Sequence, residues 1–488
     1  MAAHREIKVS NTLNGQKEPL KTVEEGHVKM YACGVTVYDH CHIGHAMQAI
    51  FFDVIRNYLE FAGYKVTYVR NYTDVDDKII VRAKERSMNP LALSQEIIES
   101  SQKDMEALGV RPATHEPKVS ESIPQIIAMV ETLVEKGHAY ATSEGDVYYK
   151  VSQKADYGKL SNRKPDELRS GTRSVVKGEK RDELDFALWK KDLTEGASWE
   201  SPWGPGRPGW HIECSAMAKD TLGDQFDIHG GGRDLVFPHH ENEIAQSESA
   251  NGCSYATHWL HSGLLTIDKQ KMSKSLGNHI SIQDFLKNWP SEVLRLAYLQ
   301  QHYSSNVDFS QSVFQAAAKR LLFFYQTLST LDQLGQNSQD PKNLLEGFDL
   351  AQDAELFHDN MANDFNTPCA LRDLLAMTKK LNELKAKKKN KTLENTARQA
   401  AQVMRELFGV LGLLTKNPEQ FITELTDKVL PTLQITESEI KAAIDDRHAA
   451  RQNKDFKAAD GIRDKLLERS IEIMDTAEGT KWAIKFTD

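Results

Sequence analysis

The chain has 488 residues, which is enough for about three domains of roughly 150 residues each. It is 40% hydrophobic and 27% charged, and this balance excludes a collagen-like, wholly disordered or disulfide-dense chain. The formal net charge of −9 argues against a protein that coats nucleic acid through bulk positive charge, although it leaves room for a local nucleic-acid surface.

Targeting signals and cysteine usage indicate the compartment. The longest apolar stretches, such as Val410–Leu414, are much shorter than the ~20 residues that a membrane span needs. Residues Met1–Lys8 lack the apolar core of a signal peptide. The five cysteines are odd in number and form no C-x-x-C pair, which argues against a disulfide framework. We therefore expect a cytoplasmic protein without a membrane partner.

The first predicted unit is a strand, a helix and a second strand. His27–Cys33 favours a strand, and Lys65–Arg70 alternates and is β-branched, as a second strand would be. Between them, from Met47 to Phe61, apolar residues recur at spacings of three and four, which is one face of a helix. This order predicts a βαβ unit of a parallel sheet, whose ligands bind at the carboxyl ends of the strands. Here that edge is Cys33–His45.

The middle of the chain differs from this first unit. We interpret residues 121–205 as an insertion, in which Pro124–Lys136 favours a helix and Lys154–Asp185 is charged and rich in turns. A second α/β stretch follows it. There, Phe226–His229 predicts a strand and Gly230–Gly232 a tight turn.

Beyond about residue 300 the pattern becomes helical. Three apolar stripes begin at Val313, Leu371 and Val403, and Gly335–Asn343 is expected to be a loop. The segment after Pro418 predicts a charged helix pair and ends in a short strand, Lys481–Phe486. The basic run Lys385–Lys391 is either a solvated helix end or loop, or a local nucleic-acid surface.

Two short segments could bind phosphate. His42-Ile43-Gly44-His45 lies where the first strand gives way to the helix, and a helix N-terminus suits an anion. Lys271-Met272-Ser273-Lys274-Ser275 would be a cationic clamp for charge on a phosphate. Taken separately, a pair of surface histidines and an exposed loop explain them equally well. The sequence contains neither a P-loop nor a dinucleotide fingerprint.

Together, these two segments, about 230 residues apart, resemble the signatures of class I aminoacyl-tRNA synthetases. The resemblance implies a split Rossmann-like catalytic domain, with His42, His45, Lys271 and Lys274 as catalytic and ATP-binding residues.

A third group of residues could hold a metal ion. His239 and Glu243 lie four residues apart, on one face of a helix, and Cys214 lies 25 residues before His239. With Cys33 at the end of the first strand, they would be a four-ligand zinc set. For either cysteine alone the alternative is a small buried apolar residue. For His239 and His240 alone it is a structural pair.

Further motifs narrow the resemblance to the cysteinyl-tRNA synthetase family, and it covers nearly the whole chain. It implies that Cys33, Cys214, His239 and Glu243 bind one Zn²⁺ per chain, which the thiolate of the substrate cysteine joins. The motifs are Tyr31–Asp39, Arg70–Lys78, Gly209–Ser215, Phe237–Glu243 and Asp364–Pro368.

Three more residues follow from the family pattern. Thr73 and Trp210 would bind the amino acid, and Asp234 would face ATP or the amino acid, or would only stabilise a turn. The family often has an arginine where this chain has Met47, so the contact of that arginine is in doubt here.

The resemblance also implies the architecture. It is an α/β fold: a split Rossmann-like parallel-sheet catalytic domain with an insertion, then a helical bundle and a small C-terminal anticodon-binding domain. The expected parts are residues 1–120 and 206–265 (the two catalytic halves), 121–205 (a connective peptide), 266–310 (a stem-contact region with the lysine loop), 311–418 (a tRNA-binding, DALR-like helical bundle) and 419–488 (the anticodon-binding domain).

The implied reaction is the ATP-dependent activation of L-cysteine and its transfer to the 3′-terminal ribose of tRNA(Cys), with Mg²⁺ accompanying ATP and the chain acting as a monomer. Trp482 could stack on an anticodon base or fill a small core.

Two alternative functions remain open at this point. One is a cysteine:amino-sugar ligase of the mycothiol type, which would lack an end like residues 419–488. The other is a catalytically silent tRNA- or zinc-binding paralogue, which should have lost signature residues.

Overall fold

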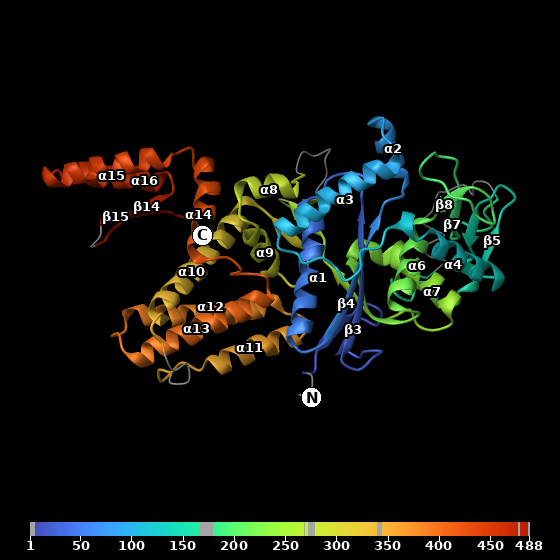
Figure 1. The fold of residues 1–488 in the computed structure, drawn as a ribbon, viewed down its shortest axis with the longest axis horizontal. Coiled ribbons are helices and arrows are strands. Elements are labelled where there is room, and N and C mark those ends of the chain that lie inside the picture. The colour runs from blue at the N-terminus through green and yellow to red at the C-terminus, as the bar shows by residue number, and fades with distance from the viewer. Residues whose placement is uncertain are drawn as a thin grey trace. The chain divides into compact units, whose positions relative to one another are not determined.

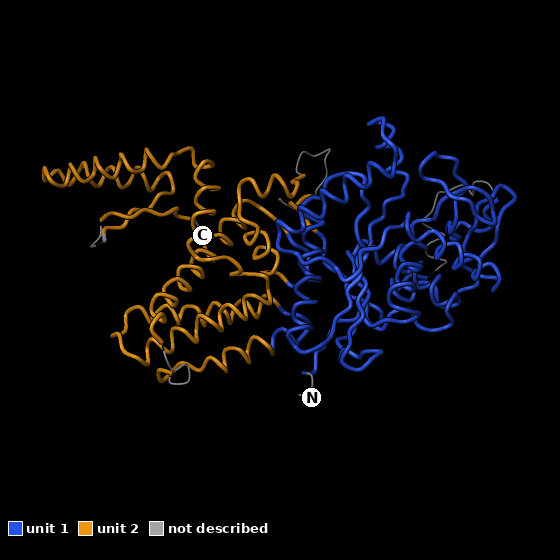
Figure 2. The backbone as a smooth tube through the Cα atoms, in the orientation of Figure 1, with its two compact units in different colours: residues 1–264, 302–307, 359–366 blue, residues 265–301, 308–358, 367–488 orange. Residues whose placement is uncertain are grey.

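The computed structural model describes residues 5–164, 179–267, 269–271, 279–338, 344–476 and 479–486. The chain divides into two compact units (Figure 2). Unit 1 comprises residues 1–264, 302–307 and 359–366, and unit 2 comprises residues 265–301, 308–358 and 367–488. None of the helices within the described ranges combines the length and the apolar character that crossing a membrane requires.

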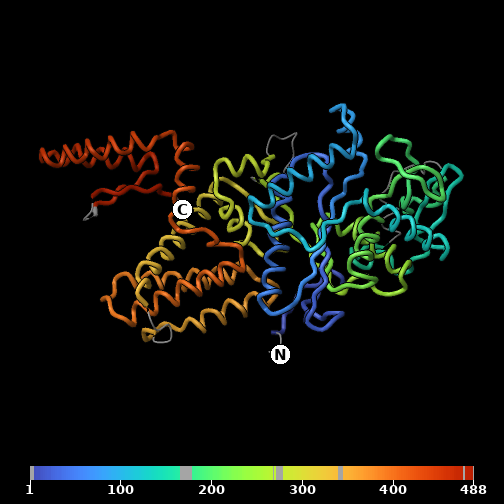
Figure 3. Tube along the Cα trace, viewed as in Figure 1, coloured from blue at the N-terminus to red at the C-terminus, as the bar shows by residue number. Residues whose placement is uncertain are grey.

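Unit 1 is built around a four-stranded sheet in which every neighbouring pair is parallel. The order β10-β9-β3-β4 places the two halves of the unit side by side, and Figure 3 follows the chain through them by colour. The predicted parallel sheet and its first βαβ unit are therefore confirmed. The strands are β3 His27–Thr36, β4 Lys65–Thr73, β9 Phe226–Gly232 and β10 Ala256–Ser262.

Helix α1, Ile43–Phe61, connects β3 to β4 (Figure 1). Its predicted apolar face is buried from Met47 to Tyr58, and Phe61 is half-buried. Phe52 and Leu59, outside the predicted stripe, are buried as well. The helix is therefore covered on more than one side within the unit.

The three glycines of Gly230–Gly232 end strand β9 and do not form the predicted tight turn. A Cβ atom on Gly230 would lie 2.3 Å from the ring of Phe52, and one on Gly231 would lie 2.6 Å from the ring of His240. The glycines are needed because the side chains of Phe52 and His240 pack closely against the strand, so close packing, not turn geometry, explains the run.

The insertion folds as a helix and a small antiparallel sheet within unit 1. Its helix α4, Ile123–Glu135, confirms the predicted one. The sheet, of order β5-β6-β7-β8, was not predicted, because three of its strands have only three residues and show no periodicity. The strands are β5 Ala139–Ala141, β6 Val147–Tyr149, β7 Phe186–Lys191 and β8 Gly206–Pro208.

Two short segments, residues 302–307 and 359–366, return to unit 1. Asp364, in the second of them, links them to the rest of the unit. Its carboxylate accepts hydrogen bonds from the Ser10 backbone N–H at 2.8 Å and from the Tyr303 hydroxyl at 2.9 Å. The neighbouring Phe365 packs edge-on against Tyr58 of α1. The motif that begins at Asp364 thus has a structural role in this unit. The other elements of unit 1 are β1 Lys8–Asn11, β2 Gln16–Pro19, α2 Asp77–Glu85, α3 Pro90–Ala107, α6 Trp210–Leu222 and α7 Glu241–Asn251.

Unit 2 is largely helical, as the apolar stripes predict. Buried Glu292 accepts hydrogen bonds from Tyr325 and from the backbone N–H groups of Leu414 and Thr415, which fixes the turn after α13. The helices beyond residue 280 are α8 Ile282–Asn288, α9 Ser291–Leu299, α10 Gln311–Gly335, α11 Leu350–Ala362, α12 Thr367–Asn382, α13 Lys391–Val410, α14 Pro418–Val429, α15 Glu437–Gln452 and α16 Phe456–Glu468.

The chain ends in the hairpin of β14, Ile471–Thr476, and β15, Gly479–Ile484. The charged helix pair and the terminal strand that we predicted after Pro418 are thus present as α15, α16 and β15.

Of the predicted loop Gly335–Asn343, Gly335 is the last residue of α10, and residues 339–343 lie outside the described ranges. A further small sheet has the order β12-β11-β13 and consists of β11 Leu265–Ile267, β12 Gln270–Lys271 and β13 Val307–Phe309.

Candidate active site

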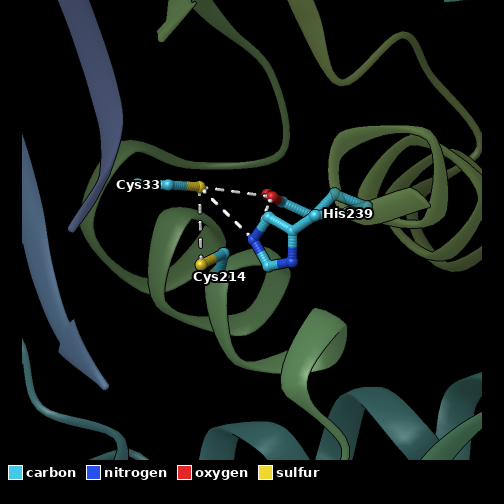
Figure 4. A group of neighbouring side chains, drawn as sticks. Cys33, Cys214 and His239 are labelled. Atoms are coloured by element: carbon cyan, nitrogen blue, oxygen red, sulfur yellow. Dashed lines mark hydrogen bonds and ion pairs between the residues drawn. The ribbon is translucent and has the colours of Figure 1, made fainter. Parts of the chain in front are cut away.

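Four potential metal ligands converge at the sheet of unit 1. Cys33 lies on β3, Cys214 on α6, His239 in the turn Val236–His240 and Glu243 on α7. All four are buried, and their ligand atoms lie within 4.8 Å of one another. The three labelled side chains in Figure 4 point toward one another from these separate elements. The fold therefore brings together the four residues of the predicted zinc set.

The three distances from Cys33 match the ligand spacing of a tetrahedral zinc site, and the distance between His239 and Glu243 is slightly shorter than that spacing. The Cys33 Sγ atom lies 3.7 Å from Cys214 Sγ, 3.5 Å from His239 Nε2 and 3.4 Å from Glu243 Oε1. His239 Nε2 and Glu243 Oε1 are 3.0 Å apart. Tetrahedral zinc with bonds of about 2.0–2.3 Å separates its ligand atoms by about 3.3–3.8 Å. Two sulfurs, an imidazole and a carboxylate are also ligand types that zinc accepts.

Without a metal, shared protons balance the charges of the cluster. The hydrogen bond from the Cys33 thiol lowers the pKa of Cys214 to about 6, against the opposing effect of burial. Burial and the neighbouring Cys214 raise the pKa of Cys33 well above its usual value. Burial alone would lower the pKa of His239, but the Glu243 carboxylate and Cys214 outweigh it and raise the pKa to about 10. A metal cation would replace these protons.

Neighbouring side chains outside the four-residue cluster orient Glu243 and His239. Glu243 Oε2 accepts a hydrogen bond from Tyr255 at 3.1 Å and lies 2.9 Å from His229 Nε2, which leaves Oε1 on the side of the sulfurs. Burial would raise the pKa of Glu243, but His229 and His239 keep it well below its usual value. His211 Nδ1 lies 2.9 Å from His239 Nδ1.

Sequence reasoning missed these outer partners, although His211 stands within a quoted motif and His229 within a predicted strand. His229 and His240 form a second possible metal group with Cys33 and Glu243. In that group, however, one carboxylate oxygen of Glu243 already bonds to His229.

The structure also positions the two proposed amino-acid contacts. Thr73, at the carboxyl end of β4, is buried and donates a hydrogen bond to Glu213, the residue before Cys214. Trp210, the first residue of α6, is 39% exposed, and its ring centroid lies 4.2 Å from that of His239. Thr73 thus bonds to the residue that precedes the ligand Cys214, and Trp210 packs against the ligand His239.

Asp234 lies beyond the end of β9, in the turn Arg233–Leu235. It lines a cavity of about 620 Å³ with Phe237 and two arginines, Arg163 and Arg233. Within the described ranges of the chain, Asp234 forms no hydrogen bond or ion pair with the four residues of the cluster. Phe237, which lines the cavity, precedes His239 by two residues in the sequence.

His42 and His45 lie at the N-terminus of α1, as predicted. The His42 ring accepts hydrogen bonds from the backbone N–H groups of Gly44 and His45, so the side chain of His42 already uses two N–H groups that we expected to face a phosphate. The two imidazole rings stack with centroids 3.7 Å apart. Gln48 on the same helix donates to the Cys33 carbonyl at 2.8 Å and ties α1 to the strand of the cluster.

Lys271 is described only by its backbone, at the end of β12, and Lys274 lies outside the described residues.

Family models and curated relatives match nearly the whole chain. Residues 19–319 match a model of the class I (C) tRNA synthetase catalytic domain, and residues 356–415 match a DALR domain. A cysteine–tRNA ligase of Desulfotalea psychrophila is 44% identical over 98% of this chain and 99% of its own length. One of Geobacter metallireducens is 46% identical over 98% of this chain and all of its own length.

Solved structures agree on the fold. A methionyl-tRNA synthetase of Mycobacterium tuberculosis, in complex with methionyl-adenylate, covers 85% of this chain and 95% of its own chain, with a TM-score of 0.60 at 14% identity. A putative arginyl-tRNA synthetase of Campylobacter jejuni covers 80% of this chain and 94% of its own, with a TM-score of 0.53 at 16% identity.

Proposed function

The chain belongs to the cysteine–tRNA ligase family of class I aminoacyl-tRNA synthetases, and from this premise we propose how its residues perform the reaction. The enzyme activates L-cysteine with ATP to cysteinyl-adenylate and then transfers the cysteinyl group to tRNA(Cys). The observation that carries the assignment of the site is the convergence of two buried cysteines, a histidine and a glutamate at the sheet.

We propose that Cys33, Cys214, His239 and Glu243 bind one zinc ion, and that the side chain of the substrate cysteine is recognised there. When bound, zinc would supply a Lewis acid that prefers a thiolate to a neutral hydroxyl. The need is physical, since a pocket that separates near-isosteres such as cysteine and serine by shape alone gains only ~1–3 kcal/mol.

The substrate cysteine would be oriented by residues around this cluster. The indole of Trp210, which packs on His239 and is partly exposed, would close over it. Thr73, at the neighbouring strand end, would contact it on the other side, and its bond to Glu213 supports that position. Both roles are proposals that rest on the family pattern and on these contacts.

The chemistry would then depend on positioning and charge. In the first step a carboxylate oxygen of cysteine attacks the α-phosphorus of ATP, and pyrophosphate leaves. In the second, a hydroxyl of the terminal ribose attacks the carbonyl carbon of the adenylate, and AMP leaves. His42, His45, Lys271 and Lys274 would stabilise charge on the phosphates, together with Mg²⁺, and Asp234 would bind ATP.

The remaining assignments are also proposals. The DALR match and the helical unit 2 support a tRNA-binding role for residues 311–418, and residues 419–488 would bind the anticodon. We keep the six-part division of the chain, a monomeric state and a cytoplasmic location as hypotheses.

The first experiment joins metal content to the activation step. Purified enzyme, washed with a weak chelator, is analysed for zinc and assayed for ATP–pyrophosphate exchange with cysteine or serine. We expect one zinc per chain and exchange with cysteine only. Cys214→Ser should lose both, whereas the control Cys253→Ser, an exposed residue, should keep both.

Each outcome bears on a separate part of the proposal. Zinc without exchange would contradict the catalytic assignment of the site. Exchange without zinc would leave activation standing but would overturn our account of how serine is rejected.

A further inference from the structure

The two ring nitrogens of His239 face different neighbours. Nε2 lies 3.5 Å from Cys33 Sγ and 3.0 Å from Glu243 Oε1, on the side where a metal would bind. Nδ1 lies 2.9 Å from Nδ1 of His211. Figure 4 shows one nitrogen of His239 turned toward the sulfur of Cys33 and the other turned away.

This geometry dictates where a proton must be. A neutral histidine that binds a metal through Nε2 carries its hydrogen on Nδ1, so that nitrogen is a donor. The atom facing it, Nδ1 of His211, must then accept, and the proton of a neutral His211 must sit on its Nε2. Metal-binding histidines are usually oriented by such an acceptor, most often a carboxylate or a carbonyl.

The ring of His211 is itself held in place. It is the second residue of α6, one helical turn before Cys214, so the same helix carries a proposed ligand and the partner of another. The backbone carbonyl of His211 accepts a hydrogen bond from Gln246 at 2.8 Å. Phe186, on strand β7 of the insertion, packs edge-on against the ring with centroids 5.6 Å apart.

We propose that His211 is a positioning residue of the metal centre, whose Nδ1 accepts the Nδ1–H of His239 and keeps Nε2 of His239 directed at the metal. The proposal rests on the zinc site proposed above. The proposal also gives the insertion a function, because Phe186 of the insertion packs against the His211 ring, which in turn orients the ligand His239.

The test uses two substitutions of nearly the same shape. In His211→Asn the side-chain oxygen can take the place of Nδ1 as an acceptor, whereas His211→Leu has no acceptor. Zinc affinity is measured on the full-length enzyme by competition with a chromophoric chelator, and the coordination geometry by the visible spectrum of the Co²⁺-substituted protein. His258→Asn, which removes another buried histidine of unit 1, controls for a general loss of stability.

We expect His211→Leu to bind zinc about 10–100 times more weakly than the unmodified enzyme and to alter the Co²⁺ spectrum. His211→Asn should stay within a few-fold of the unmodified enzyme, as should His258→Asn. Should His211→Leu fold poorly, His211→Ala, which also lacks an acceptor, takes its place in both measurements.

Two results would overturn the proposal. Unchanged zinc affinity in His211→Leu would show that the acceptor is not needed, and an equal loss in the Asn and Leu variants would show that the imidazole acts in some other way. An unmodified enzyme that holds no zinc would overturn the proposed metal site together with this inference, so the two failures are distinguishable.

Discussion

At the scale of single residues, the four-residue cluster is a set of acids and bases that share protons in the absence of metal. Cys33 and His239 have raised pKa values, whereas those of Cys214 and Glu243 are lowered, because each group responds to the charge of its neighbours inside a buried site. The cluster near neutral pH therefore consists of one thiolate, one carboxylate, one thiol and one imidazolium. Metal binding must displace the protons of the last two.

This predicts the pH dependence of zinc binding. Between the pKa of Cys214, about 6, and that of His239, about 10, binding should release about two protons, one from Cys33 and one from His239. Affinity should then rise with pH, by up to ~100-fold per unit, and fall still more steeply below pH 6, where Cys214 is protonated too.

Calorimetric titration of the metal-free enzyme with zinc, in buffers of different ionisation enthalpy, counts the protons released. A count near zero at pH 7.5 would contradict the charge distribution described here. The metal-free Cys214→Ser variant, which lacks one of the four ligands, is titrated in parallel as a control. Its heat measures zinc binding that does not need the complete cluster.

At the scale of elements, helix α1 combines a structural and a proposed catalytic function in one residue. The His42 ring caps the helix by accepting hydrogen bonds from Gly44 and His45, and the same imidazole is proposed to act on the phosphates of ATP. The two functions can be separated because asparagine is a good N-cap residue, whereas alanine is not.

His42→Asn should retain the cap and unfold within a few tenths of a kcal/mol of the unmodified enzyme, but should activate cysteine at least ~100 times more slowly. His42→Ala should lose the same activity and, in addition, about 1 kcal/mol of stability. Urea unfolding and pyrophosphate exchange measure the two effects. An active Asn variant would mean that His42 has no function beyond the cap.

Strand β9 and helix α1 depend on each other through a glycine. Because a Cβ atom at residue 230 would lie 2.3 Å from the ring of Phe52, Gly230→Ala should cost about 1–3 kcal/mol of unfolding free energy through overpacking. Gly409→Ala is the matched control. That glycine lies within α13, and an added Cβ atom would meet no atom within 4 Å, so the substitution should stabilise by about 0.5–1 kcal/mol.

Thermal and urea unfolding of the two alanine variants compare these effects in the same protein. A Gly230→Ala variant as stable as the unmodified enzyme would show that Phe52 moves aside without cost, and that the glycine is not required by packing.

At the scale of the whole molecule, the proposed function places amino-acid activation and tRNA recognition in different parts of the chain. The end of unit 2 is an arrangement of α15, α16 and a hairpin, in which Arg447 makes two hydrogen bonds of 2.9 Å to Asp475. Phe486, just after the hairpin, packs against Trp289 with ring centroids 6.3 Å apart. Helix α14 lies within the proposed part 419–488 but packs against the helical bundle, where Phe421 stacks on Tyr325 with ring centroids 4.0 Å apart.

A chain that ends after Gln434 keeps α14 and removes only the terminal arrangement. We expect it to exchange pyrophosphate with cysteine at the rate of the full-length enzyme, and to require at least ~10 times more tRNA(Cys) for half-maximal aminoacylation, since the contacts of the missing part contribute at least ~1.4 kcal/mol. If both activities were unchanged, residues 435–488 would not bind the anticodon.

Local spacing in the sequence predicts the secondary elements with strong periodicity and the parallel βαβ unit, whereas residue types and the family resemblance indicate the candidate ligands. Examples of such spacing are the apolar face of α1 and the interval of four residues between His239 and Glu243, but no spacing of this kind links either cysteine to that pair. The glycine run of β9 was misjudged because a tight turn and a close contact require the same residue type, and only the neighbours Phe52 and His240 distinguish them.

Which distant groups meet depends on how separate elements pack together. Cys33 and Cys214 are 181 residues apart in the chain and 3.7 Å apart in space, and no local pattern connects them. The partnership of His211 with His239, and the support of the His211 ring by Phe186 of the insertion, likewise arise when separate elements pack on one sheet. Helix and strand propensities act over a few residues, whereas the chemistry of this site depends on contacts that exist only after the whole unit has folded.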